Sequence, residues 1–367
     1  MHKRKFAATV LGAFLLLFTN IPLAKAAEST APQLTLQQAI DQAIANSNIL
    51  KADSLAIDQA KYDRDAAGLN VTFTPSGPTT TVAEKAFTQL QQADLKWQVA
   101  KKNYDADKDT VVMKVYQAYF GVIQAQAALD AAQKALLNID WQRKVANMSF
   151  QAGIISNSQM QQTANGYSQA QAQLASAQKA LDNAYEKFNQ LVGLMPDERP
   201  VLVDRPTFMP LTINSLDAEV SRVLDASPTV WLMEKNVDLA KLALDLYSFG
   251  PTEPHTYKAT EIQVPIAEQN VANVRSQMSQ LVRSLYYSIK QAEENYTSLQ
   301  YKLAIDKENL RVAEVKYSAG LATKGDIISA QATLAQDIQN IENVLCQHQI
   351  LVKAFEKPWA YVGSTSS

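Results

Sequence analysis

The side chains that most often carry chemistry are few in this sequence and lie far apart. The histidines are His2, His255 and His348, and Cys346 is the single cysteine. No His/Cys/Asp cluster has the spacing of a metal site, no glycine-rich loop could cradle phosphate, and no nucleophile elbow occurs. We therefore expect no catalytic, cofactor-binding or metal-binding residues and no enzyme. His348 falls on an apolar heptad stripe, which favours a packed or interfacial histidine over a ligand.

The elements that could position functional side chains in this chain are long helices. No proline occurs between Pro78 and Pro196, and none occurs between Pro265 and Pro358. Because proline breaks a helix interior, these are two long stretches that permit helix. The sequence therefore predicts a mainly all-α fold.

Both stretches carry apolar residues spaced alternately by four and three positions. One stripe runs from Leu285 to Tyr317, and the same pattern 167 residues earlier runs from Ala118 to Phe150. A sustained period of 3.5 residues indicates helices that coil around their neighbours. Each stripe has one polar interruption, Asp306 or Arg143, which either fixes register or faces a water-filled lumen.

Each stripe stops at a matching turn. Gly153 and Gly320 stand where a helix C-terminus needs a left-handed residue, and Ser156 and Thr323 follow in position to cap the next helix. The apolar stripe resumes after both turns. The pattern predicts two antiparallel hairpins of long helices, as an internal duplication.

A second register supports the duplication. Leu36 to Ala67 matches Leu216 to Tyr247 at an offset of 180, with Ser47 opposite Ser227. We predict a first repeat over 27–211, a second over 212–358 and a tail at 359–367. The predicted helices span about 36–67, 84–151 and 157–192 in the first repeat, and about 216–247, 266–318 and 326–356 in the second.

The N-terminus resembles a secretory signal. A basic His2 to Lys5 precedes an apolar run from Phe6 to Phe18, and Ala24-Lys25-Ala26 offers small residues for cleavage after residue 26. Cleavage would remove four of the 34 basic residues and none of the 36 acidic ones, leaving a net charge of −6. This balance argues against a nucleic-acid partner.

At this point the chain resembles the TolC family of outer-membrane efflux proteins over essentially its whole mature length. The resemblance rests on the paired turns Ala152-Gly153 to Gln159 and Ala319-Gly320 to Asp326, and on Leu191-Val-Gly193-Leu closing the first hairpin. It implies a homotrimer whose twelve helices form a hollow periplasmic cylinder, with adaptor proteins docking at the glycine turns and an inner-membrane pump supplying energy. It also implies a β-hairpin from each half, closing a twelve-stranded outer-membrane barrel.

The segments available for those β-hairpins are short. The slots at 68–83 and 248–265 hold 16 and 18 residues and contain Pro75, Pro78, Pro251, Pro254 and Pro265. A spanning hairpin needs on the order of 20 residues or more. We therefore expect at most short strands there, such as 257–264, which do not suffice for a conventional membrane-spanning barrel.

Two functions follow as expectations. The first is an exported, TolC-like conduit in the outer membrane and periplasm that passes small molecules or proteins, as in type I secretion. The second is a non-transporting helical spacer or tether between envelope layers. Asp326 matches a position where the family places acids around its entrance, or else it complements a helix dipole. Gly153, Ser156, Gly320 and Thr323 would form the docking turns.

Overall fold

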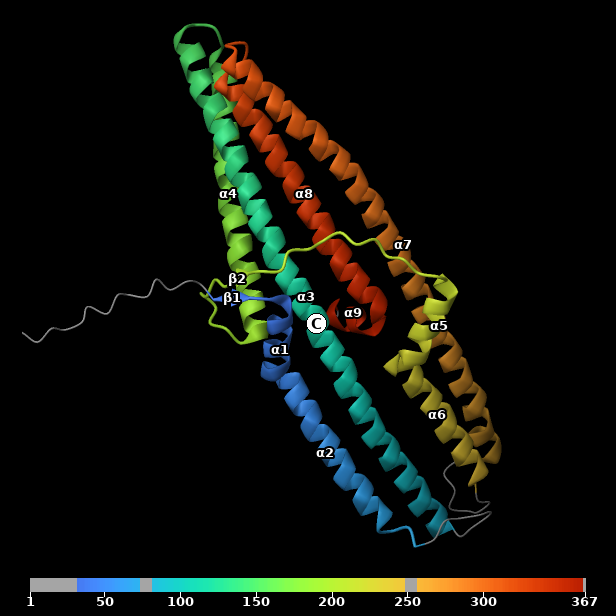
Figure 1. Ribbon diagram of the computed structural model, residues 1–367. Coiled ribbons are helices and arrows are strands. Elements are labelled where there is room, and N and C mark those ends of the chain that lie inside the picture. Colours follow the sequence, from blue (N-terminus) through green and yellow to red (C-terminus); the bar gives the residue numbers. More distant parts are fainter. Residues whose placement is uncertain (1–31, 73–80, 248–255, 366–367) are drawn as a thin grey trace, which may run out of the picture.

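The computed structural model describes residues 32–72, 81–247 and 256–365, and within them the chain is almost entirely helical (Figure 1). The predicted signal peptide at 1–26 lies outside these residues. The elements, in chain order, are β1 (Gln33–Leu34), α1 (Leu36–Asn46), α2 (Asn48–Gly68), α3 (Thr81–Gln151), α4 (Asn157–Val192), β2 (Val201–Leu202), α5 (Leu216–Ala226), α6 (Pro228–Asp245), α7 (Tyr257–Ser318), α8 (Lys324–Glu356) and α9 (Pro358–Thr365).

Two long helical hairpins form a single elongated layer. Helix α3 packs against α4 on one side and α8 on the other, and α8 packs against α7, so the order across the layer is α4–α3–α8–α7. Helix α3 has 71 residues, which gives a length of about 107 Å at 1.5 Å per residue. Both hairpin turns lie at one end of the rod, and α2 and α6 extend along α3 and α7 toward the other end (Figure 1).

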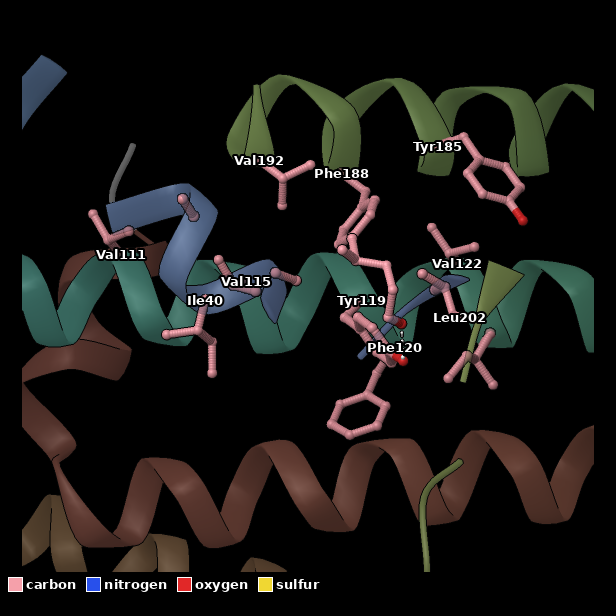
Figure 2. Close-up of a cluster of buried hydrophobic side chains, with 14 of the residues drawn as sticks. Ile40, Val111, Val115, Tyr119, Phe120, Val122, Tyr185, Phe188, Val192 and Leu202 are labelled. Atoms are coloured by element: carbon pink, nitrogen blue, oxygen red, sulfur yellow. Dashed lines mark hydrogen bonds between the residues drawn. The ribbon is translucent and has the colours of Figure 1, made fainter. Parts of the chain in front are cut away.

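The main apolar core lies at mid-length, where α1, α4 and the parallel β1–β2 pair meet α3 (Figure 2). Tyr119 and Phe188 are fully buried there and meet edge to face, with ring centroids 5.9 Å apart. The Tyr119 hydroxyl donates to the Leu34 carbonyl at 3.2 Å and accepts the Asp204 N–H at 2.9 Å. A buried tyrosine whose hydroxyl is satisfied in this way fixes β1 and the segment just after β2 against α3.

An extended segment after β2 crosses α8 and joins the two halves (Figure 1). Phe208 stacks on Tyr296 of α7 with centroids 4.1 Å apart, and the Leu211 N–H donates to Glu293 at 2.7 Å. Gln349 on α8 donates to the Thr207 carbonyl at 2.6 Å. These contacts hold the segment across the layer.

The predicted helices at 84–151, 157–192 and 326–356 correspond to α3, α4 and α8, and two other predicted helices are each divided by a serine. Ser47 ends α1 and caps α2, where its hydroxyl accepts the Leu50 N–H at 3.3 Å. Ser227 does the same between α5 and α6, accepting the Val230 N–H at 3.4 Å. An N-cap residue has non-helical backbone angles, so each serine interrupts the helix that we predicted as continuous.

Two predictions near the segment ends were wrong. The range 257–264, expected to hold a short strand, is the start of α7, because Thr256 caps the helix and Lys258 pairs with Glu261 at 2.6 Å one turn on. Pro265 lies inside this helix. The expected tail at 359–367 is largely α9. The remaining parts of the two predicted β slots, 73–80 and 248–255, lie outside the described residues. None of the helices in the described ranges has an apolar stretch long enough to cross a lipid bilayer.

Candidate functional site at the hairpin tips

Gly153 forms the C-terminal cap of α3 at the first hairpin tip. Its φ is +72°, and its N–H donates to the Phe150 carbonyl at 2.9 Å, while the next N–H, of Ile154, donates to Ser149 at 2.8 Å. This pair of bonds is the Schellman motif, which satisfies the last carbonyls of a helix. The predicted left-handed glycine is confirmed.

Gly320 repeats this geometry at the second tip. Its φ is +73°, its N–H donates to Tyr317 at 3.0 Å, and the Leu321 N–H donates to Lys316 at 2.8 Å. A Cβ added at Gly153 or Gly320 would meet nothing within 4 Å. Backbone conformation alone therefore requires glycine at both positions, and the tips are open to the surroundings.

The next helices begin with capping boxes that are also duplicated. The Ser156 hydroxyl accepts the Gln159 N–H at 3.2 Å, and the Gln159 side chain accepts the Ser156 N–H at 2.9 Å. In the second copy, Thr323 accepts the Asp326 N–H at 3.3 Å, and Asp326 accepts the Thr323 N–H at 2.7 Å. Each turn is thereby rigid from the end of one helix to the start of the next.

Asp326 is exposed, and its carboxylate is occupied within its own turn. The N–H and hydroxyl of Thr323 hydrogen-bond this carboxylate and, with Lys316 nearby, hold the pKa of Asp326 below its ordinary value. The residue is therefore ionised across the neutral range, in the first turn of α8. This geometry provides both a helix cap and a fixed negative charge.

A contact that the sequence did not indicate joins the second tip to α3. The indole of Trp141 on α3 lies against Gly325 on α8, where an added Cβ would be 2.6 Å from Nε1. Glycine at the second position of a helix has poor helix propensity, which is the only sequence signal for this close approach.

The polar interruptions of the stripes make contacts within the chain. The Arg143 guanidinium pairs with Asp140 at 2.8 Å and lies 4.3 Å from the ring centroid of Tyr167. Asp306 accepts from Lys302 at 3.3 Å, and Lys302 also pairs with the buried Asp337.

His348 is a packed histidine, as predicted. It is buried, with Nε2 3.6 Å from a Glu293 oxygen and its ring 5.5 Å from that of Phe208. Among the described residues, no group of three or more His, Cys, Asp or Glu side chains could hold a metal ion.

Three solved structures of outer-membrane proteins have a fold similar to that of this chain. The Campylobacter jejuni CmeC outer membrane channel is 13% identical and superposes over 90% of this chain and 86% of its own, with a TM-score of 0.65. The outer membrane protein VceC of Vibrio cholerae is 14% identical over 89% and 95% of the two chains, with a TM-score of 0.62. The Neisseria gonorrhoeae MtrE channel in its open state is 16% identical over 88% of each, with a TM-score of 0.58.

No protein-family model matches the sequence, and no curated protein matches it. At these identities the likeness defines the fold. The chain thus has the mainly helical TolC-like fold of outer-membrane channels, as the sequence predicted.

Proposed function

We propose that the chain is one protomer of a trimeric, TolC-like export conduit in the outer membrane and periplasm. The observation that carries this proposal is the pair of hairpins whose turns, built from the same cap motifs, lie at one end of a shared layer. Similarity of fold to outer-membrane channels over about 90% of the chain supports it. The conduit has no catalytic role and passes small molecules or proteins.

Exposed apolar side chains on α7 favour assembly with further copies. Tyr287, Tyr301 and Ile305 are 64%, 71% and 62% exposed, on a helix at the edge of the layer. Helix α4 forms the opposite edge. Joining the α7 edge of one copy to the α4 edge of the next would close the layer into a tube and cover these side chains.

The tips would then carry the partner contacts. Gly153 with Ser156, and Gly320 with Thr323, form two rigid turns for docking a periplasmic adaptor that links the tube to an inner-membrane pump. Asp326 is the candidate acid at the entrance. The two repeats, 27–211 and 212–358, correspond to the two hairpins with their flanking helices.

The test is the mass of residues 27–367 by light scattering, with and without detergent. A trimer is the expected result in at least one condition, and bound detergent would add support for membrane insertion. Closure also predicts disulfide cross-links between cysteines placed on α4 of one copy and α7 of another. A stable monomer that shows no such cross-link would overturn the conduit and favour the helical spacer or tether.

A further inference from the structure

A groove of about 660 Å³ lies between α3 and α4 near mid-length of the rod. Lys114, Gln117 and Gly121 of α3 line it, together with Lys187 and Gln190 of α4. Lys187 and Gln190 are exposed, and a Cβ added at Gly121 would meet nothing within 4 Å, so the floor of the groove is open. Pockets that bind small organic molecules typically measure about 300–1,000 Å³, and this groove falls within that range.

The two ammonium groups of this groove, here the α3–α4 groove, have no carboxylate partner. Among the described residues, Lys114 and Lys187 form no ion pair, and no acidic residue lines the groove. Asp107 interacts electrostatically with Lys114 from seven residues away, but burial and the neighbouring Asp53 raise the pKa of Asp107. Because the whole chain has a net charge of −2, the positive charge of this groove is a local feature.

The α3–α4 groove opens on the side of the layer away from α1 and α9. Lys108 and Val112 of α3 line a cavity with residues of α1 and α9, so they mark the side that carries those helices. At about 100° per residue, the α3 residues of the groove point on average roughly 160° away from the α3 residues of that cavity. The groove and the two short helices therefore lie on opposite sides of α3.

The wall between the groove and the first hairpin tip is uncharged on this same side. Residues spaced alternately by four and three stay on one side of a coiled helix. Traced from the groove, the α3 stripe consists of Ala118, Gly121, Ala125, Ala128, Ala132, Ala135 and Ile139. The α4 stripe consists of Gln162, Gly166, Gln169, Gln173, Ser176, Ala180 and Asn183. A solute moving along this wall from the tip end of these stripes meets no charge in either of them until it reaches Lys114 and Lys187.

We propose that the α3–α4 groove binds small organic anions and that the conduit therefore favours anionic cargo. The inference rests on the proposed function, in which α1 and α9 lie outside the tube because they would otherwise fill the passage, so that the groove faces the passage. The ammonium groups of Lys114 and Lys187 pair with a carboxylate, phosphate or sulfonate, and the amides of Gln117 and Gln190 donate hydrogen bonds to it. Three copies repeat the groove at one level around the axis, which raises the local concentration of anions there.

The experiment measures binding of a pyrenetrisulfonate dye to purified residues 27–367 by fluorescence anisotropy. We expect binding that weakens as salt rises, because exposed charges are screened over about 10 Å at 0.1 M salt. K114Q/K187Q should weaken binding about tenfold, whereas K114R/K187R should retain it. G121L should also weaken binding, because its side chain fills the groove without changing the charge.

The matched control is K108Q/K134Q, which removes two exposed lysines from the opposite side of α3 and should leave the affinity unchanged within about twofold. Circular dichroism confirms that each variant is folded. Absence of dye binding by the wild-type chain would overturn the anion site. An affinity that K114Q/K187Q leaves unchanged, or that K108Q/K134Q reduces equally, would overturn it as well.

Light scattering on the same samples separates this inference from the conduit itself. A trimer that binds no dye would remove the anion site and keep the conduit. A monomer would remove the conduit, whether or not it binds the dye.

Discussion

Trp141 on α3 and Gly325 on α8 touch so closely that a Cβ at position 325 would lie 2.6 Å from the indole Nε1 and 2.9 Å from Cδ1. Alanine normally stabilises a helix relative to glycine, by about 0.5–1 kcal/mol. At this position the clash opposes that gain. The absence of a side chain at 325 therefore allows α3 and α8 to approach near the tip.

The first prediction is that G325A destabilises the fold by about 1–3 kcal/mol, the usual cost of overpacking. Thermal unfolding followed by circular dichroism would measure the change. The matched control is G166A on α4, where an added Cβ meets nothing within 4 Å, and which should raise stability. Combining G325A with W141L should recover most of the loss. Equal stability of G325A and G166A would contradict the contact.

The second prediction ranks three left-handed glycines. G153A and G320A should each cost roughly 1–2 kcal/mol, because only backbone strain opposes the new Cβ. G193A should cost more, since its φ is +82° and the Cβ would also collide with Asn46, which donates to the Val192 carbonyl at 2.6 Å. Chemical denaturation of the three variants would give the order. A G193A variant no worse than G153A would refute the ranking.

The third prediction concerns the buried Asp337 carboxyl and its partner Lys302. Burial raises the pKa of Asp337, while the ammonium of Lys302 opposes that rise. K302M leaves the carboxylate without its cation and should cost about 1–3 kcal/mol at pH 7, discounted because Lys302 is half exposed.

The pH dependence of this variant follows from linkage. Because the folded-state pKa is above the unfolded one, the penalty is complete above the folded-state pKa, decreases below it, and is gone below the unfolded-state pKa. Adding D337N to K302M removes the unpaired charge and should restore stability at pH 7. Denaturation of both variants at pH 7 and near pH 4 tests this, and a penalty independent of pH would count against it.

The fourth prediction concerns the attachment of α9. Asp109 on α3 accepts the Trp359 indole N–H at 3.1 Å and pairs with Lys357 at 2.5 Å. D109A should loosen α9 and cost about 1 kcal/mol, the lower end of the range for unsatisfied polar partners, because Lys357 is 43% exposed. Hydrogen exchange should show faster exchange in 358–365 than in α4. Unchanged protection of α9 would show that apolar packing alone holds it.

The fifth prediction separates the two roles of Asp326. D326N keeps an oxygen that can accept the Thr323 N–H but removes the charge, whereas D326A removes both. Because the pKa of Asp326 is lowered, its stabilisation is complete above the ordinary carboxyl pKa and is lost as pH falls through the folded-state value. D326A should therefore lose stability at pH 7 but not in strong acid.

If Asp326 also forms a charged entrance, D326N should reduce cation conductance of the reconstituted protein while remaining stable. Conductance equal to that of wild type in D326N would leave only the capping role. The matched variant Q159E, at the equivalent position of the first tip, adds a charge to the other capping box and controls for charge alone.

Local chemistry decided what could be predicted from the sequence. Glycine turns followed by Ser or Thr located the tips to the residue, and the 157–192 helix has its predicted bounds, because capping signals are short and specific. The predicted helices 36–67 and 216–247 missed the breaks at Ser47 and Ser227, although both serines are recognisable in the sequence as N-cap residues. Residues 257–264 are helical although their β-branched and aromatic side chains favour a strand, because the Thr256 cap outweighs that preference.

Contacts between distant residues were beyond such patterns. Nothing in the neighbourhood of Trp141 indicates that it meets Gly325, 184 positions later. His348 was correctly predicted to lie on a packed helix face, but its neighbour Glu293 comes from α7, as does Lys302, the partner of the buried Asp337. Periodicity identifies which face of a helix is buried, but it does not identify the residues of other helices that pack against that face.

The layer order α4–α3–α8–α7 has a consequence for the sequence of assembly. Helix α4 follows α3 after a five-residue turn, so the first hairpin forms through local contacts, which favours fast folding. The other side of α3 packs against α8, which comes much later in the chain. The hydrogen bond from Gln124 to the Asn343 carbonyl, at 3.3 Å, joins residues 219 positions apart. When the chain emerges from its N-terminus, the first hairpin can therefore fold early. The face of α3 that packs against α8 then stays exposed until nearly the last residues emerge. The rest of the chain must therefore emerge faster than the exposed apolar face of α3 can aggregate.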